Sequence, residues 1–433
     1  MSDSTLSNVS ASVANNDDVK VSAAKARYLE AVEPDSCLAQ TMRVSEVSDI
    51  PGADKIQAYT VGGWKCVAAK NAFKKGELVV YIRIGAVLDP DFPQWAFLEG
   101  NPLKTKKIRG VISQGLIGSV NWISEQGLVE VFKLIEAEGK PIYKDTDSAY
   151  CFLPENVNLT KILHVRKYVE SEESSLYSSQ SSASKQSSSP TLVPRPAFIP
   201  KTDAERVQNI TQQQWQELKG MTAWNTRKED GTSATYWFNP SGAFAPLIPP
   251  GPPHVSGGVN LPHASILGGP GAPSSPEFGI CSRNCGIAGN PKGSEHYGLM
   301  NEKFHIEQEL RALNRPLAIQ GEIVGPKING NRLQLTDYDF RVFGMWDIEK
   351  QCYLDPKEVW ELAGKMKLNT VPLISTVVIG DTESSSDFWI QQAETQKYTK
   401  NVQAEGIVFM VHDQFRHLRF KAISNNYLLK HNL

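Results

Sequence analysis

A serine-dominated segment divides the chain, and it constrains the possible folds more than any other feature. Residues 169–192 consist largely of serine with few apolar side chains. Such a segment cannot bury enough apolar surface to fold, so we interpret it as a flexible linker. The stretch on each side is long enough to form a domain, since domains typically have about 100–200 residues. We therefore expect two domains, at 26–168 and 193–433, after a polar and disordered segment at 1–25.

The first domain shows the pattern of short strands. Apolar and polar residues alternate in brief runs, such as Ile56 to Val61 and Leu78 to Ile82, and Gly- and Pro-marked turns separate the runs. Gly62-Gly63 is typical of a hairpin turn. These alternations predict that the region from about Ala31 to Lys167 is all-β, with five or six strands. That number and length of strands indicates a small barrel of the OB type.

The second domain mixes helices with strands and is predicted to be α+β with mainly antiparallel sheets. Its expected helices are Thr211 to Lys219, with Thr211 as N-cap, Asn301 to Asn314 and Pro356 to Lys367. A Pro/Gly-rich stretch at 239–276 interrupts the domain and can sustain neither a helix nor a central strand. We expect it to be a long exposed loop inserted between two strands.

Composition limits the class of protein. The net charge is −2 and hydrophobic residues make up 40% of the chain, which is typical of a soluble globular protein and predicts no binding of nucleic acid by bulk charge. No apolar run reaches the roughly 18 residues that span a bilayer, and the start of the chain lacks the apolar core of a secretory signal. We expect a cytoplasmic or nuclear protein that is not secreted, with no membrane partner, and a monomer by default.

The six cysteines are scattered and do not resemble a disulfide framework. Cys281 and Cys285, followed by His296 and His305, lack the spacing of a standard zinc site. Buried free thiols are the simpler interpretation.

Lys228 is the first candidate for chemistry. It stands in Lys228-Glu229-Asp230-Gly231, where Asp-Gly signals a turn before the strand-like Ser233 to Phe238. A lysine at such a turn can project into a pocket, and its amine is a nucleophile only when its pKa is lowered enough to leave it neutral. For this short pattern alone, an exposed turn lysine is the commoner interpretation.

Two glutamates interrupt apolar strands. Glu322 lies within Ile319 to Gly325, and Glu405 precedes Ile407 to Val411. A charge on a buried strand must be paired or functional. Carboxylates there could hold Mg²⁺ or ribose hydroxyls, or form structural ion pairs.

Several cations and aromatic residues could bind a nucleotide. Arg283 could hold a phosphate bidentately, or lie on the surface. Arg419 and Lys421 are two apart in a strand and share one face, which is unfavourable unless an anion such as a triphosphate lies between them or solvent covers both. Phe343 and Trp346 could stack on a base, although core packing is the default for either.

These residues, in this order, resemble the motifs of the covalent nucleotidyltransferases, the superfamily of polynucleotide ligases and capping enzymes. The resemblance covers roughly Trp224 to Lys430. Six strings carry it: Lys228 to Gly231, Ser282 to Asn284, Gln320 to Gly325, Phe343 to Ile348, Glu405 to Val408 and Phe420 to Asn425.

Three segments, Asp230 to Thr235, Gln320 to Lys327 and Lys421 to Lys430, are most similar in sequence to the ATP-dependent RNA ligases of the RNA ligase 2-like branch. Some of these carry an OB domain before the ligase domain, and Val44 to Gly76 and Ile108 to Gly115 are similar to it. The sequence ends 12 residues after Lys421, so we expect no C-terminal OB domain of the kind found in DNA ligases and capping enzymes.

The resemblance implies the chemistry. Lys228 would attack the α-phosphate of ATP to form a lysyl-adenylate, AMP would pass to an RNA 5′-phosphate, and a 3′-hydroxyl would then displace AMP. The implied cofactor is Mg²⁺ or Mn²⁺, with Glu405 and Asp230 holding its waters. The implied ATP contacts are the motif residues Asp230 and Gly231, Glu322 on the ribose, Phe343 on adenine, Arg283 on a phosphate or the RNA end, and Lys421 with Arg419 on the α-phosphate.

One departure from the family pattern is Arg227, which precedes the lysine where these ligases usually have glutamate. The insertion at 239–276 is another. The implied partners are RNA ends, in nicked or structured RNA. In the first domain, basic residues at Lys104, Lys106, Lys107 and Arg109 could contact RNA phosphates or form a solvated hairpin. Two alternatives remain open: an RNA-binding OB protein with a degenerate ligase domain, and a DNA ligase or capping-type enzyme.

Overall fold

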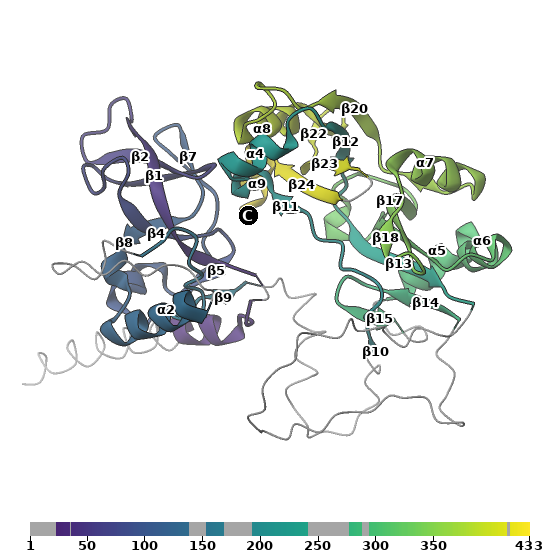
Figure 1. Ribbon diagram of the computed structural model, residues 1–433, viewed down its shortest axis with the longest axis horizontal. Helices are drawn as coiled ribbons and strands as arrows, with labels where there is room; N and C mark the ends of the chain where they lie inside the picture. The colour runs from purple at the N-terminus through teal and green to yellow at the C-terminus, as the bar shows by residue number, and fades with distance from the viewer. Residues whose placement is uncertain are drawn as a thin grey trace, which may run out of the picture.

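The computed structural model describes residues 23–34, 36–137, 153–168, 193–240, 277–287, 294–413 and 416–433. The linker predicted at 169–192, nearly all of the disordered segment predicted at 1–25 and almost the whole insertion predicted at 239–276 lie outside these residues. The described part forms two domains, which Figure 1 shows side by side.

The first domain is built on a five-stranded antiparallel sheet, sheet 1, with the order β3-β2-β1-β4-β8. Its strands are β1 (Ala39–Asp49), β2 (Ile56–Val61), β3 (Trp64–Ala69), β4 (Leu78–Ile82) and β8 (Leu116–Ser119). The long β1 pairs with β2 through one half and with β4 through the other, and its register shifts between Val44 and Glu46. Such a bulge bends a strand, so that the sheet curls as an OB-type barrel requires. The predicted hairpin turn at Gly62-Gly63 is confirmed between β2 and β3.

Short elements complete the first domain. They are β5 (Ala86–Val87) paired with β9 (Arg166–Lys167), the hairpin of β6 (Lys106–Ile108) and β7 (Val111–Ser113), the 3₁₀ helices η1 (Pro93–Leu98) and η2 (Val120–Trp122), a helix over 23–30, and α2 (Glu125–Ala137).

The helix α2 shows that the all-β prediction for the first domain is wrong at this point. Leu128, Val131 and Ile135 are buried and join the core that includes Val80 and Ile82 of sheet 1. Their spacing of three and four residues is that of one helix face.

The second domain contains two sheets, and the α+β prediction is confirmed. Sheet 2 has the order β10-β15-β14-β13-β16-β17-β18, with β19 also on β17. Its strands are β10 (Val193–Pro194), β13 (Thr232–Phe238), β14 (Phe278–Cys281), β15 (Cys285–Ile287), β16 (Leu317–Val324), β17 (Asp339–Asp347), β18 (Cys352–Tyr353) and β19 (Asn369–Thr370). Sheet 3 has the order β11-β24-β23-β12-β20, with β11 (Glu205–Arg206), β12 (Thr222–Lys228), β20 (Leu373–Val378), β23 (Gly406–His412) and β24 (His417–Ile423). The strands β21 (Lys397–Thr399) and β22 (Val402–Gln403) form a separate antiparallel pair, which precedes β23 in the chain.

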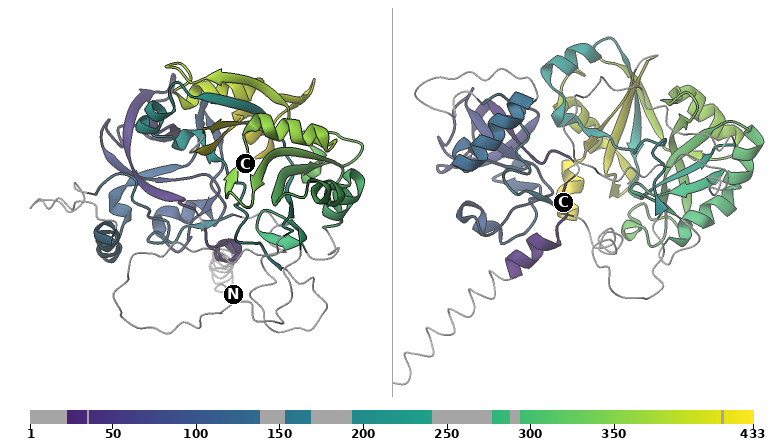
Figure 2. Two further views of the ribbon diagram at one scale, coloured as in Figure 1. Left: turned by 45° about the vertical axis from the view of Figure 1, so that its right-hand side comes forward. Right: turned by 60° about the horizontal axis from the view of Figure 1, so that its bottom comes forward.

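Helices cover the outer faces of both sheets. Their bounds are α4 (Gln212–Leu218), α5 (Glu295–Phe304), α6 (Ile306–Leu313), α7 (Pro356–Lys365), α8 (Ser386–Thr395) and α9 (Asn425–His431), with 3₁₀ turns η4 (Val207–Asn209) and η5 (Asn329–Asn331). One core joins sheet 2 to α5, α6 and α7, and another joins sheet 3 to α4 and α8. In Figure 2 the two sheets of this domain converge, with the helices outside.

Two of the three expected helices are confirmed. Thr211 caps α4 in a reciprocal capping box with Gln214, and α7 begins at Pro356 behind the cap Asp355. The single helix expected at Asn301 to Asn314 is wrong, because His305 adopts a left-handed conformation with φ 53° and separates α5 from α6. An L-residue in that region ends a helix. The helices α8 and α9 were not predicted.

The two domains contact each other through several hydrogen bonds. Trp64 donates its Nε1–H to Asn209 at 2.8 Å, and the Gly63 amide donates to the Gln208 carbonyl at 3.0 Å. The Thr105 amide donates to the Leu433 carbonyl at 2.8 Å. Figure 2 shows α9, in yellow, between the domains. Among the described helices, none has the length and apolar character needed to cross a bilayer.

Candidate active site

A pocket of about 400 Å³ lies between sheets 2 and 3. The chain leaves sheet 3 at the end of β12 and enters sheet 2 at the start of β13, so residues 228–232 cross from one wall of the pocket to the other. Side chains alternate along a strand, and on β24 Phe420 and Ala422 join the helix-covered core while Arg419 and Lys421 line the pocket. The apolar residues therefore fix the strands, and the intervening charged residues form the site.

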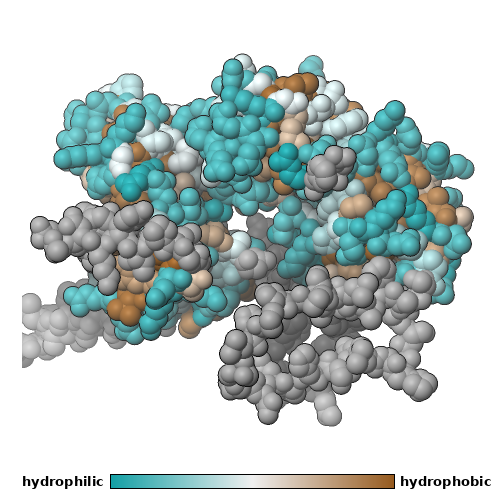
Figure 3. Space-filling view, in the orientation of Figure 1, coloured by the Kyte–Doolittle hydropathy of each residue, from teal (hydrophilic) through white to brown (hydrophobic). Residues whose placement is uncertain are grey.

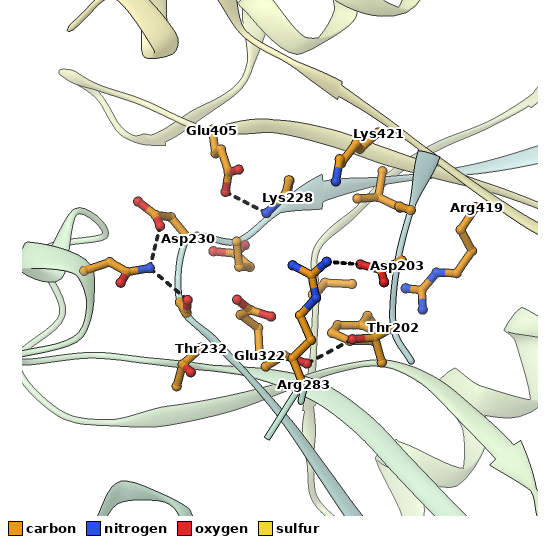
Figure 4. A pocket seen from close by; sticks show the side chains of 18 of the residues that line it. Thr202, Asp203, Lys228, Asp230, Thr232, Arg283, Glu322, Glu405, Arg419 and Lys421 are labelled. Atoms are coloured by element: carbon orange, nitrogen blue, oxygen red, sulfur yellow. Dashed lines mark hydrogen bonds and ion pairs between the residues drawn. The ribbon is translucent and has the colours of Figure 1, made fainter. Parts of the chain in front are cut away.

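Lys228 ends β12 and points into the pocket toward Glu405 (Figure 4). Its Nζ lies 2.7 Å from Glu405 Oε2, and the two side chains are 24% and 18% exposed. Burial by itself would lower the pKa of Lys228, but the carboxylates of Glu405, Glu322 and Asp230 together raise it above its ordinary value. The interpretation of Lys228 as an exposed turn lysine is therefore wrong, and the free amine is held protonated by its neighbours.

Glu322 lies on β16, opposite Ser233 of β13, and lines the same pocket. Burial raises its pKa to about 8, Lys228 opposes that shift, and the nearby Glu405 adds to it. At neutral pH this carboxyl is therefore largely protonated, unless an additional positive charge enters the pocket.

Asp230 is tightly bound by protein donors. Its Oδ2 accepts hydrogen bonds from Arg332 Nη1 at 2.8 Å and from the Tyr427 hydroxyl at 2.5 Å, and its Oδ1 accepts one from Asn329 Nδ2 at 2.9 Å. The residue is 7% exposed. Three donors on one carboxylate leave little capacity for a metal ion in its inner shell.

The donor set fits a divalent cation held through water. Among the described residues, no group of three or more His, Cys, Asp or Glu side chains closes into a direct metal site. Glu405, Glu322 and Asp230 nevertheless all lie close to Lys228, and Mg²⁺ usually keeps several of its waters. The roles of Glu405 and Asp230 in holding those waters stay predictions.

Lys421 lies near Lys228 in Figure 4. Its pKa is lowered to about 8, mainly by burial and also by the neighbouring cations Arg206, Lys228 and Arg283, while Glu405 opposes the shift. A half-buried amine surrounded by cations is a site for an anion.

Arg206 was missed by the sequence reasoning. It lies on β11, which pairs in parallel with β24 so that Arg206 is in register with Lys421. Burial lowers the pKa of Arg206 while Glu405 and Tyr81 raise it, and its Nη1 is buried without a hydrogen bond. Because β11 has two residues, no periodic signal marks it in the sequence.

Arg419 occupies a different end of the pocket from Lys421. Its guanidinium lies 4.5 Å from the centroid of the Phe343 ring, and its Nε and Nη1 are buried without hydrogen-bond partners. Arg419 therefore shares the face of Lys421, as predicted, but lies beside the aromatic residue rather than beside Lys228. Trp346 donates its Nε1–H to the Phe198 carbonyl at 3.0 Å, packs on Tyr353 and has the structural role that was its default.

Comparison with known proteins agrees with this geometry. Residues 222–423 match the RNA ligase family model, and residues 38–120 match a model of an OB-fold domain. This chain carries an RNA ligase domain. The OB-fold domain precedes it, and both predicted domain types are confirmed.

Solved structures of the Naegleria gruberi RNA ligase are similar to this chain over 91–92% of its length. A variant with ATP and Mn is 27% identical, covers 91% of this chain and 99% of its own, and superposes with a TM-score of 0.66. The same ligase with PPi is 27% identical, with 92% and 99% covered and a TM-score of 0.65. Another variant, with AMP and Mn, is 27% identical, covers 92% of this chain and 99% of its own, and superposes with a TM-score of 0.66. No match was found among curated protein sequences.

The mouth of the ligase pocket carries Arg283 on the turn between β14 and β15. Arg283 forms an ion pair with Asp203 across the pocket (Figure 4), and its side chain is 40% exposed. Arg195 donates its Nη1–H to the Ser282 carbonyl at 2.6 Å and so supports this turn. Arg283 is therefore available to an incoming anion that displaces Asp203.

Arg227 lines the ligase pocket beside Lys228, and its guanidinium is held by neighbouring side chains. Its Nε donates to Glu229 Oε1 at 2.9 Å, and its guanidinium lies 5.4 Å from the Tyr398 ring centroid. Glu229 has a side-chain exposure of 0% and also pairs with Arg341 at 3.0 Å. The departure from the family pattern is thus compensated locally, because Glu229 pairs with the arginine.

The basic residues of the OB-fold domain do not enter the ligase pocket. Lys106 and Lys107 lie on β6 and are exposed, Arg109 is exposed at the hairpin turn with φ 48°, and Lys104 is half-buried. Their contact with RNA stays a prediction.

The cysteines give no support for zinc. Cys281 is 1% exposed, packs with Trp237 and Ile199, and has its pKa raised by burial to about 11. Cys285 contacts Ser282 through its Sγ at 3.1 Å. Neither belongs to a metal-binding cluster of the described residues.

Proposed function

We propose that the protein is an ATP-dependent RNA ligase that joins a 3′-hydroxyl to a 5′-phosphate through a lysyl-AMP intermediate. One observation carries the proposal: Lys228 Nζ lies 2.7 Å from Glu405 Oε2 in a pocket where Glu322 and Lys421 arrive on two other strands. The similarity to a ligase solved with ATP and Mn, with AMP and Mn, and with PPi supports the same nucleotide chemistry here.

The first requirement of this reaction is a neutral lysine. Glu405, Glu322 and Asp230 raise the pKa of Lys228 against the effect of burial. Glu405 would hold a divalent cation through water, and the positive charge of that cation would offset these carboxylates and lower the pKa of the amine. Lys228 would then lose its proton to solvent and become a nucleophile.

In the adenylation step, Lys228 Nζ forms a bond to the α-phosphorus of ATP and the bond from that phosphorus to pyrophosphate breaks. Negative charge on the reacting phosphate is offset by Lys421, which is half-buried on β24. A preorganised cation in a site with little water stabilises such charge more than a solvated one. The approach of the phosphates also raises the pKa of Lys421 and keeps it protonated.

The adenosine moiety fits the part of the pocket away from Lys421. Phe343 offers a ring for stacking on the base, and Arg419 lies against that ring at 4.5 Å. Glu322, in the pocket wall between the two ends, can hydrogen-bond a ribose hydroxyl.

In the later steps AMP passes from Lys228 to the RNA 5′-phosphate, and the 3′-hydroxyl attacks that phosphorus with AMP as the leaving group. Arg283 at the mouth is suited to hold the 5′-phosphate in exchange for Asp203. The exposed basic hairpin of the OB-fold domain is suited to hold the RNA backbone.

Labelling with α-³²P ATP tests the proposal. The purified protein with Mg²⁺ or Mn²⁺ is expected to acquire a covalent label, and Lys228→Ala is expected to acquire none. Lys219→Ala is a matched control, because Lys219 pairs with Asp381 on the surface. The proposal is wrong if wild-type protein takes no label, or if Lys228→Ala takes as much as wild type.

Sealing assays define the substrate. We expect joining of a nicked RNA duplex with a 3′-hydroxyl and a 5′-phosphate, and no labelling by GTP. Labelling by GTP would identify a capping-type enzyme, and sealing of DNA alone would identify a DNA ligase. Binding of RNA without any adduct would identify a degenerate ligase domain.

A further inference from the structure

Gln114 lies at the junction of the two domains, in the Ser113-Gln114-Gly115 turn that follows the basic hairpin. It is 4% exposed. Its Nε2 donates to Asn425 Oδ1 at 3.2 Å, and its Oε1 accepts from Gln208 Nε2 at 3.4 Å. One carboxamide of the OB-fold domain therefore connects two separate segments of the ligase domain.

The backbone around Gln114 is held in place. Its amide donates to the Lys65 carbonyl at 2.8 Å, and its carbonyl accepts from the Tyr81 hydroxyl at 3.0 Å. Gly115 has φ +107°, and a Cβ there would lie 2.5 Å from the Ile82 carbonyl oxygen. The carboxamide is thus presented from a turn with little freedom to move.

Asn425 is the first residue of α9, and both ends of this helix are fixed. The Glu394 carboxylate accepts hydrogen bonds from the Ser424 hydroxyl at 2.8 Å and the Asn425 amide at 2.5 Å. At the other end, the Leu433 carbonyl accepts from the Thr105 amide of the OB-fold domain. The position of α9 is therefore set partly by the OB-fold domain.

Tyr427 connects α9 to Asp230, which lines the pocket. It lies two residues after Asn425, and its hydroxyl donates to Asp230 Oδ2 at 2.5 Å. Arg332 Nη1 donates both to the Tyr427 hydroxyl at 2.5 Å and to Asp230 Oδ2 at 2.8 Å. Asp230 in turn lies two residues after Lys228, on the turn between the sheets.

The contact with Gln208 connects Gln114 to Lys421, the second lysine of the pocket. Gln208 is in η4, which directly follows β11, and its carbonyl also accepts from the Gly63 amide at 3.0 Å. Arg206 of β11 is in register with Lys421 of β24. The hydrogen bond to Asn425 is therefore connected through a few residues to Lys228. The hydrogen bond from Gln208 is connected in the same way to Lys421.

We propose that Gln114 is a positioning residue for lysine adenylation. By holding α9 and η4 at a fixed separation, it places Tyr427 on Asp230 beside Lys228 and Arg206 beside Lys421. Its hydrogen bonds act on the geometry of the reacting groups and not on the binding of ATP, since Gln114 does not line the pocket. The proposal rests on the proposed ligase function.

The test compares Gln114→Met with Gln57→Met. Methionine keeps the length of the glutamine side chain and removes both hydrogen bonds. Gln57 is a matched control, because it is 8% exposed in the same domain and its partners Asp49, Tyr59 and Asn71 belong to that domain. The readouts are kcat and KM for ATP in the adenylation step, with thermal melting of each variant.

Gln114→Met is expected to lower kcat about tenfold, the effect of losing well-placed buried hydrogen bonds, with KM for ATP changed less than about threefold. Gln57→Met is expected to leave both constants within about twofold of wild type. In combination with Tyr427→Phe, the loss is expected to be smaller than the product of the two single effects, because both variants break the same connection. Should Gln114→Met fail to fold, Asn425→Ala removes one of its contacts from the ligase side and must give the kcat defect.

The proposal is overturned if Gln114→Met behaves as Gln57→Met does, if only KM changes, or if its effect multiplies with that of Tyr427→Phe. These outcomes are distinct from failure of the ligase proposal, in which the wild-type protein itself takes no label.

Discussion

The charged residues of the ligase pocket and those of the OB-fold hairpin differ in their surroundings. In the pocket, Lys228 and Glu405 are 24% and 18% exposed and in contact, and burial shifts the pKa of both Glu322 and Lys421 to about 8. On the hairpin, Lys106 and Lys107 are exposed. Buried charges fix one another's position and protonation, whereas solvated charges act through weak, screened attraction.

The surface reflects this division. In the orientation of Figure 3, both domains present a mainly hydrophilic surface to solvent, with apolar patches scattered between. Charge is therefore common on the molecule, and what distinguishes the pocket is charge removed from water. Substitutions in the pocket should have the largest effects, and those on the hairpin the smallest.

The largest effect is expected for Lys421→Met. It removes a half-buried cation next to the reacting phosphate, and we expect adenylation to slow roughly 100-fold or more. Lys400→Met, on an exposed lysine, is the control and should react as wild type does. Single-turnover labelling with ATP measures both, and a rate within threefold of wild type would remove Lys421 from the reaction.

The next effect is expected for Glu405→Gln, which leaves the shape of the pocket but removes a charge. The concentration of Mg²⁺ needed for half-maximal adenylation should rise about tenfold or more. In the absence of metal, the pKa of Lys228 should fall, because Glu405 is the largest of the influences that raise it. Titration of adenylation with Mg²⁺ measures the first change. An unaltered metal requirement would contradict the predicted role of Glu405.

A third effect concerns stability. The pKa of Glu322 is about 8 in the folded protein and near 4.5 without its environment, so between these pH values the folded state binds a proton that the unfolded state has lost. This group therefore makes the free energy of unfolding fall as pH rises through that window, by at most about 1.4 kcal/mol per pH unit.

Glu322→Gln should flatten that dependence. Urea unfolding of both proteins at pH 5, 6.5 and 8, without nucleotide or metal, measures it. If the free energies of unfolding of the two proteins depend on pH in the same way, Glu322 does not have a raised pKa in the folded protein.

The smallest effect is expected for the hairpin, with Lys104, Lys106, Lys107 and Arg109 changed to glutamine together. Sealing of nicked RNA should weaken several-fold and depend less on salt, because phosphate contacts release counterions. Lysine adenylation should be unchanged. Loss of both activities would indicate misfolding, and loss of neither would show that the hairpin is merely solvated.

Local patterns predict most of the ligase pocket because its residues lie on regular strands. Glu322 and Lys421 stand among apolar neighbours, and strand alternation then requires them to face the opposite side from the core. Thr211 caps its helix as its side chain predicts, and Pro356 stands in the first turn of α7 as expected. The break at His305 could not be predicted, because nothing in its neighbours requires a left-handed residue there.

Arg206, Tyr427 and Gln114 belong to short or irregular elements, and the sequence alone did not assign them to the site. Their partners are far away in the chain: Gln114 and Asn425, for example, are 311 residues apart. Such contacts depend on how domains pack, which no local pattern encodes.

The sequence by itself determined that the chain has a lysine, two carboxylates and a basic strand in the order of a nucleotidyltransferase, because each is marked against an apolar background. Only the tertiary structure decided their working relations. It paired Lys228 with Glu405, separated Arg419 from Lys421 by moving it onto Phe343, and surrounded Asp230 with donors. These differences arise because the packing of strands that are distant in sequence sets how close the ionisable side chains lie and how buried they are. Proximity and burial in turn set the protonation of these side chains.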